Sequence, residues 1–137
     1  MKLSVIIPCF NEDLVIKETY KRLTRVLNEI KHEYELVFIN DGSKDKTYDI
    51  LLQLSTEDKN VKILNFSRNF GHQCAVTAGI NYCTGDAAVI IDSDLQDPPE
   101  VIVDMLKIME EQKANVVYGV RKKRKARMQS RLLLLPF

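Results

Sequence analysis

Cysteine is scarce in this sequence. The 137 residues include three cysteines, an odd number, and no two of them form a Cys-x-x-Cys pair. A disulfide framework or a structural zinc site is therefore not expected, and a reducing compartment such as the cytoplasm is favoured. Cys9 lies in an apolar, strand-like run, so we expect it to be a small buried residue.

Long apolar runs and an excess of one charge are also missing. The N-terminus does not have the layout of a signal peptide, and the longest terminal apolar run, 132–135, is far shorter than the roughly 20 residues that span a bilayer. We therefore expect no transmembrane segment in this chain. The net charge of +1 gives no electrostatic reason to expect nucleic acid as a partner.

Two glycine-rich phosphate-binding signatures are absent. The sequence contains neither G-x-G-x-x-G after its first predicted strand nor G-x-x-x-x-G-K-[ST]. The first absence argues against a nicotinamide-linked oxidoreductase. A diphosphate bound by this chain would need a metal ion and basic side chains instead of a glycine cradle.

What the sequence does contain is a regular alternation of strand and helix patterns. Strands are predicted at 3–8, 34–39, 61–66, 87–91 and 115–120. Helices are predicted from about 16 to 30, 44 to 57, from 75 to a stop at Gly85, and 97 to 112, the last capped by Asp97. This order predicts an α/β fold with a Rossmann-like, doubly wound parallel sheet.

One composition break divides the chain. Residues 1–120 are expected to form a single nucleotide-binding domain, and 121–137 a basic tail. The tail either contacts phosphates or an anionic membrane surface, or is a disordered, solvated end. Both interpretations are open.

Polar residues follow four of the predicted strands. In an open α/β sheet, ligands bind beyond the carboxyl ends of the strands, so these residues should meet at one edge. The segments concerned are 10–12, 40–43, 67–69 and 92–97. This convergence predicts a binding site there.

Asp92-Ser93-Asp94 is the most specific of these segments. Residues two apart in an extended chain point to the same side, so the two carboxylates form a site of hard oxygen ligands for Mg²⁺ or Mn²⁺. A solvated acidic loop, or a cap for the next helix, is the alternative. The position after a fully apolar strand favours the metal interpretation.

Other polar residues near this edge are ambiguous on local evidence. Asp41 either accepts a hydrogen bond from a base or ribose, or belongs to an ordinary Asp-Gly turn. Glu12 either contacts a ligand or is an acid in the first turn of a helix. A lone histidine such as His72 is more often structural than catalytic.

Taken in order, these motifs resemble family 2 glycosyltransferases of the GT-A fold. The resemblance is strongest to the branch that moves a sugar from a nucleotide sugar to a polyprenyl phosphate, which includes dolichyl-phosphate mannose synthase and bactoprenol glucosyltransferases. It covers about residues 1–125 and rests on the segments 5–12, 40–43, 67–71 and 92–100.

The resemblance implies a role for each matching residue. Pro8, Asn11, Glu12 and Asp41 would hold the base and ribose of a UDP- or GDP-linked sugar. Asp92 and Asp94 would bind a divalent cation, and Asp92, Gln96 and Arg121 would lie at the donor. The implied reaction is an inverting transfer to a polyprenyl phosphate at the inner face of the membrane.

The C-terminal part departs from the family pattern. Family members usually continue well beyond this point, so a truncated chain is expected, and a donor-binding fragment without turnover is the main alternative function. A phosphorylated receiver domain shares the five-strand architecture, but its aspartate after the third strand is replaced here by 67–69, Ser-Arg-Asn.

Overall fold

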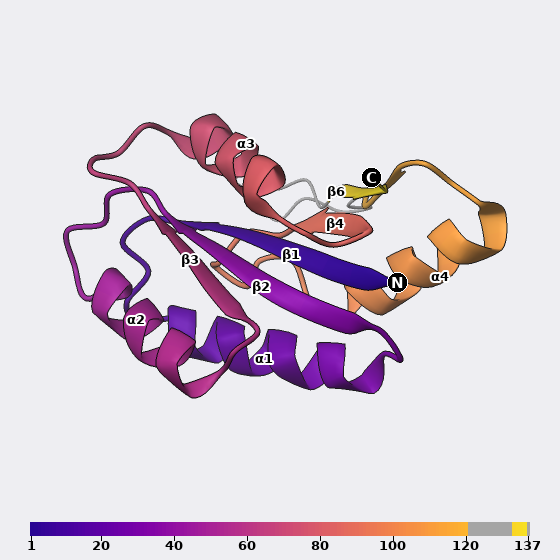
Figure 1. Ribbon diagram of the computed structural model, residues 1–137, viewed down its shortest axis with the longest axis horizontal. Coiled ribbons are helices and arrows are strands. Elements are labelled where there is room, and N and C mark those ends of the chain that lie inside the picture. The colour runs from indigo at the N-terminus through magenta and orange to yellow at the C-terminus, as the bar shows by residue number, and fades with distance from the viewer. Residues whose placement is uncertain (121–132, 137) are drawn as a thin grey trace.

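The computed structural model describes residues 1–120 and 133–136, and it has the predicted alternation of strands and helices (Figure 1). The strands are β1 (Lys2–Cys9), β2 (Glu33–Asn40), β3 (Val61–Asn65), β4 (Ala87–Ile90), β5 (Val117–Tyr118) and β6 (Leu133–Pro136). The helices are α1 (Ile16–Glu29), α2 (Thr47–Glu57), α3 (His72–Tyr82) and α4 (Val101–Gln112).

All six strands form one sheet in the order β3-β2-β1-β4-β6-β5. The first four strands along the chain are mutually parallel, with Leu3 opposite both Tyr34 and Ala87. Helix α3 covers one face of the sheet, and α1, α2 and α4 cover the other (Figure 1). The α/β fold with a Rossmann-like parallel sheet is therefore confirmed.

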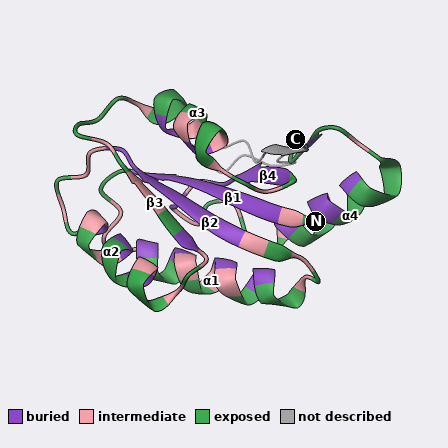
Figure 2. Ribbon diagram, in the orientation of Figure 1, coloured by how far each residue is buried: buried purple, intermediate pink, exposed green. Residues whose placement is uncertain are grey.

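The strand residues alternate between two hydrophobic cores. Val5 and Ile7 pack with α1, α2 and α4, whereas Ile6 packs with α3. Because both faces are covered, β1 and β4 are apolar almost throughout, and Figure 2 shows them buried at the centre of the molecule. On α3, a Cβ at Gly79 would come within 2.5 Å of Ile6, so glycine permits this helix to lie close against the sheet.

The far edge of the sheet differs from the prediction. A parallel strand was expected over 115–120, but β5 is only two residues long and does not pair with β4. Strand β6 lies between them and is antiparallel to both. Strand β6 takes the edge of β4, and this excludes β5 from that position. The residues of β6 were assigned to the basic tail.

The start of α4 also differs. Instead of beginning after an Asp97 cap, the helix begins at Val101, and its N-cap residue, Glu100, makes no side-chain capping bond. Pro98 and Pro99 form a preceding turn, in which the amide of Val101 donates to the Pro98 carbonyl. Glu100 instead accepts from Arg22 at 2.8 Å and Arg25 at 3.3 Å, which ties α4 to α1.

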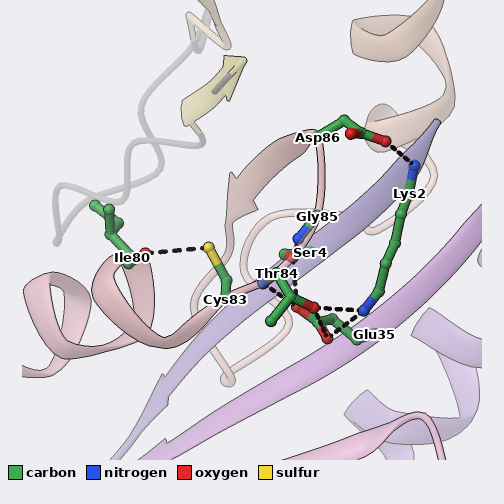
Figure 3. A network of polar contacts seen from close by, with 8 residues as sticks. All are labelled: Lys2, Ser4, Glu35, Ile80, Cys83, Thr84, Gly85 and Asp86. Atoms are coloured by element: carbon green, nitrogen blue, oxygen red, sulfur yellow. Dashed lines mark hydrogen bonds and ion pairs between the residues drawn. The ribbon is translucent and has the colours of Figure 1, made fainter.

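At the amino end of the parallel strands, Glu35 is the centre of a buried polar cluster (Figure 3). Its carboxylate accepts from the Lys2 ammonium at 2.8 Å, the Ser4 hydroxyl at 2.7 Å and the Thr84 amide at 2.7 Å. Burial alone would raise the pKa of Glu35, but these donors outweigh it and hold the pKa at about 2. The cluster joins β1, β2 and the segment before β4.

Among the described residues, none of the helices combines the length and the apolar character that a bilayer crossing requires.

Candidate functional site

A pocket of about 290 Å³ opens at the carboxyl edge of the parallel strands, the end away from the N-terminus in Figure 1. It is lined by residues from 8–12, by Asp41, by residues from 69–75 and by 92–94. Residues that follow four different strands therefore meet in one cavity. This is the place where parallel α/β sheets bind their ligands.

Backbone-to-side-chain hydrogen bonds join the loops after β1 and β2. The Asn11 amide donates to the Ser43 hydroxyl at 2.9 Å, and the Asn11 side-chain oxygen accepts from the Lys44 amide at 2.9 Å. The Glu12 amide donates to the Thr47 hydroxyl at 2.8 Å. Asn11 itself is exposed and has a φ of 52°, so here it shapes the rim of the pocket.

The Glu12 carboxylate lies near other carboxylates. Its pKa is raised, first by burial and then by the charge of Asp94, with smaller contributions from Asp45 and Asp92; a hydrogen bond with Ser93 opposes the change. Like charges close together disfavour ionisation of each other. A cation placed among these carboxylates would relieve that repulsion.

Asp41, which is buried at the end of β2, binds the neighbouring loop. Its carboxylate accepts from the amide of Phe70 at 2.7 Å and from the amide of Gly71 at 3.1 Å. The ordinary Asp-Gly turn and a role in the site were alternatives in the sequence. In the structure, Asp41 both lines the pocket and fixes the segment that enters α3.

The Asp92-Ser93-Asp94 segment is held from behind by α1. The buried Thr19 hydroxyl lies 2.6 Å from the Ser93 carbonyl oxygen, to which it donates. The Asp94 carboxylate accepts from the Gln96 amide at 3.0 Å, and the intervening Leu95 has a φ of 59°. This turn directs the chain away from the pocket after Asp94.

The carboxylates of this segment suit a divalent cation that brings other ligands with it. Within the described residues, no group of three or more His, Cys, Asp or Glu side chains is arranged to hold a metal alone. Asp92 and Asp94, however, both line the pocket. Mg²⁺ and related ions are commonly bound by one or two carboxylates together with substrate phosphates and water.

The structure places the predicted site residues in three groups. Pro8, Glu12, Asp41, Asp92 and Asp94 line the pocket. Asn11 and Gln96 lie beside it, outside its lining, and both are exposed. Arg121 lies outside the described residues.

Sequence reasoning missed residues that support or complete the site. Cys9 and Ala75 line the pocket, and Thr19 and Thr47 hold its loops. The two threonines sit in helices and resemble any other helical threonine in the sequence. Only the packing of α1 and α2 against the loops reveals their role.

Open parallel α/β sheets bind their ligands, nucleotides among them, at this carboxyl edge. The sequence profile of the family described as "Glycosyl transferase family 2" matches residues 4–133. The chain belongs to that family.

Two relatives of this chain are named as glycosyltransferases or homologs of them. An uncharacterized glycosyltransferase of Bacillus subtilis, YkcC, is 54% identical over 125 residues, which are 91% of this chain and 38% of that protein. A prophage bactoprenol glucosyl transferase homolog of Escherichia coli is 48% identical over 108 residues, which are 78% of this chain and 35% of that protein. The chain thus spans little more than a third of these relatives.

A solved structure shares the fold. The mannosyltransferase PcManGT from Pyrobaculum calidifontis, in complex with GDP-Man and Mn²⁺, superimposes with a TM-score of 0.72 at 20% identity, covering 88% of this chain and 35% of that one. Together with the family match, this confirms a GT-A fold.

Proposed function

We propose that this chain is the donor-binding part of a glycosyltransferase that moves a sugar from a nucleoside diphosphate sugar to a polyprenyl phosphate. The donor carries uridine or guanosine, the transfer inverts the anomeric centre, and a Mg²⁺ or Mn²⁺ ion takes part. The reaction takes place at the inner face of the membrane.

The observation that carries this proposal is the charge of the pocket. Four carboxylates line it, those of Glu12, Asp41, Asp92 and Asp94. Among the described lining residues, His72 is the only side chain that can become positive. A diphosphate would be repelled by such a cavity, whereas a diphosphate accompanied by a divalent cation would be attracted to it.

Each predicted site residue is assigned to one part of the metal-bound donor. As the family resemblance implies, Pro8 near the end of β1, Asn11 and Glu12 in the loop after it, and Asp41 directly after β2 are assigned to the base and ribose. Asp92 and Asp94 are assigned to the cation, with Gln96 at its edge. Arg121 is assigned to the diphosphate.

During transfer, a phosphate oxygen of the acceptor attacks the anomeric carbon, and the bond from that carbon to the nucleoside diphosphate breaks. A bound divalent cation would neutralise the charge that grows on the leaving diphosphate. The contribution of this chain is to hold the donor so that its anomeric carbon faces the open side of the pocket.

The relatives support the finer parts of the proposal. The Escherichia coli relative is named as a homolog of a bactoprenol glucosyl transferase, which favours a polyprenyl phosphate acceptor. The Pyrobaculum structure holds GDP-Man and Mn²⁺, which favours a metal-bound nucleotide sugar.

A second function follows from the length of the chain relative to these relatives. Such a chain would bind the donor in the same acidic pocket without catalysing transfer. In that case the chain acts as a nucleotide-sugar-binding module.

Calorimetric titration with UDP-glucose and GDP-mannose, each with and without Mn²⁺, tests the proposal. We expect one donor to bind in a metal-dependent manner and the Asp92→Ala, Asp94→Ala double variant to bind neither. The exposed pair Asp49→Ala, Asp104→Ala removes the same charge away from the pocket and should bind like the unmodified chain. Failure of both donors to bind under any condition would contradict the proposal, and sugar transfer to a polyprenyl phosphate would separate enzyme from binding module.

A further inference from the structure

One wall of the pocket is formed by residues 67–71, which belong to the connection between β3 and α3, together with the first turn of α3. Asn69 and Gly71 line the cavity, and His72 follows at the start of the helix. Most of this connection is exposed. Its position therefore depends on how it is attached to the sheet.

Asp41 provides a two-point attachment. One carboxylate oxygen accepts from the Phe70 amide and the other from the Gly71 amide. The acceptor of both bonds is a carboxylate, and Asp41 itself is only 4% exposed. Such charge-assisted hydrogen bonds are roughly twice as strong as those between neutral groups.

Gly42 brings the same segment into backbone contact with the turn after β2. Its φ is 68°, and a Cβ atom there would lie 2.3 Å from the Arg68 carbonyl carbon and 2.4 Å from the Asn69 nitrogen. Only glycine leaves room for this approach. Asp41 and Gly42 thus hold two successive parts of one connection.

Contacts on the outer side of the connection shape it locally. The Arg68 guanidinium lies 4.0 Å from the centre of the Phe70 ring, and that ring meets Phe66 edge-on at 5.6 Å. Arg68 and Phe70 are exposed, so these contacts are weak. They order the segment but do not attach it to β2.

We propose that Asp41, besides its assigned contact with the base or ribose, is a positioning residue: it fixes the 67–71 connection as a wall of the donor pocket, so that part of the donor affinity depends on Asp41 through Asn69 and the start of α3. This inference rests on the proposed function, since it takes the pocket to be the donor site. Asp41 holds the connection in place before any ligand binds.

The chemistry of the attachment requires a carboxylate. Two amide donors face the two oxygens of Asp41. Asparagine has the same shape but only one acceptor, and its NH₂ group would face a second N–H donor. Asp41→Asn is therefore a sharp test, because it removes the second acceptor and leaves the volume unchanged.

Hydrogen exchange of the ligand-free full chain measures the attachment directly. In Asp41→Asn we expect the Phe70 and Gly71 amides to exchange roughly tenfold faster or more, since each loses a charge-assisted bond. The control is Asp92→Asn, which changes another carboxylate of the pocket lining. Unchanged exchange in Asp41→Asn would overturn the proposal, whether or not any donor binds.

A double-mutant cycle with Gly42→Ala then measures the effect on binding of the donor that the calorimetry identifies. Gly42→Ala displaces the connection without touching the carboxylate. If both changes act through the connection, the loss of affinity in the double variant will be smaller than the product of the single losses. Losses that multiply would overturn the proposal, because they would show that donor affinity does not depend on Asp41 through the connection. Arg68→Ala is a milder second variant, should Gly42→Ala fail to fold.

Discussion

Two glutamates have opposite electrostatic surroundings, and they lie at opposite ends of the parallel strands. Glu35 at the amino end is surrounded by donors from Lys2, Ser4 and Thr84, and its pKa is held at about 2. Glu12 at the carboxyl end lies among other carboxylates, and its pKa is raised by burial and by Asp94. Both oxygens of Glu35 accept hydrogen bonds within the protein, whereas burial and the nearby Asp94 carboxylate disfavour the charge of Glu12.

The Glu35 cluster therefore stabilises the fold, whereas the carboxylates around Glu12 are suited to binding a cation. A satisfied buried carboxylate stabilises the folded state, and a cluster of repelling carboxylates destabilises it until a cation arrives. The following expectations test this contrast.

Replacing Glu35 should have the largest effect. Glu35→Ala leaves the Ser4 hydroxyl and the Thr84 amide without their acceptor, so we expect the free energy of unfolding to fall by about 3 kcal/mol. Urea denaturation measures this. Glu33→Ala, an exposed position on the same strand, should change stability by less than about 0.5 kcal/mol.

Acid should weaken the same cluster. Because the pKa of Glu35 is lowered in the folded state to about 2, its contribution is fully present above pH 4.5, the ordinary pKa, and is lost as the pH falls toward 2. The full contribution corresponds to about 3 kcal/mol. Urea midpoints between pH 7 and pH 2 should fall more steeply for the unmodified chain than for Glu35→Gln. Parallel curves would contradict this expectation.

Thr19→Val should have an intermediate effect. It retains the β-branched shape but leaves the Ser93 carbonyl without its donor, so we expect a loss of stability of about 1–2 kcal/mol. Metal-dependent donor affinity should also fall, about tenfold, because the backbone between Asp92 and Asp94 loosens. Thr19→Ser restores the hydroxyl and should recover most of the affinity; equal affinities in Thr19→Val and the unmodified chain would show that α1 does not position the acidic segment.

Glu12→Gln should have the smallest effect on stability, and in the opposite direction. It removes one charge from a repelling cluster, so we expect the melting temperature without metal to rise slightly. Adding Mn²⁺ together with the donor should stabilise the unmodified chain more than the variant. A lower melting temperature for Glu12→Gln without metal would mean that the carboxylate stabilises the fold.

The sequence was most informative where one local rule decides the outcome. The unbroken apolar runs of β1 and β4 indicated a sheet covered on both faces, and the polar residues after them indicated its binding edge. It was less informative where distant segments compete. The antiparallel placement of β6 beside β4 depends on which strand takes a free edge, and Glu100, directly before α4, is bound by Arg22 and Arg25 of the distant helix α1.

Within the site, residue types could be predicted but contacts could not. Asp92 and Asp94 were selected by their spacing, and the pocket contains both. Thr19 and the attachment between Asp41 and the Phe70 amide involve residues far apart in the chain. No local pattern marks them, because the same residue types are common in helices and turns that have no such partner.

The central place of β1 has a consequence for how the chain folds. Its first residues pair on one side with β2, which follows after a single helix, but on the other side with β4, where Leu3 meets Ala87. During synthesis, the β1–α1–β2 unit can form early. The other edge of β1 stays unpaired until β4 has been synthesised. Long-range pairing of this kind slows folding and leaves an apolar edge open to wrong partners. A newly made chain is therefore most vulnerable to aggregation in the interval between the synthesis of these two neighbouring strands.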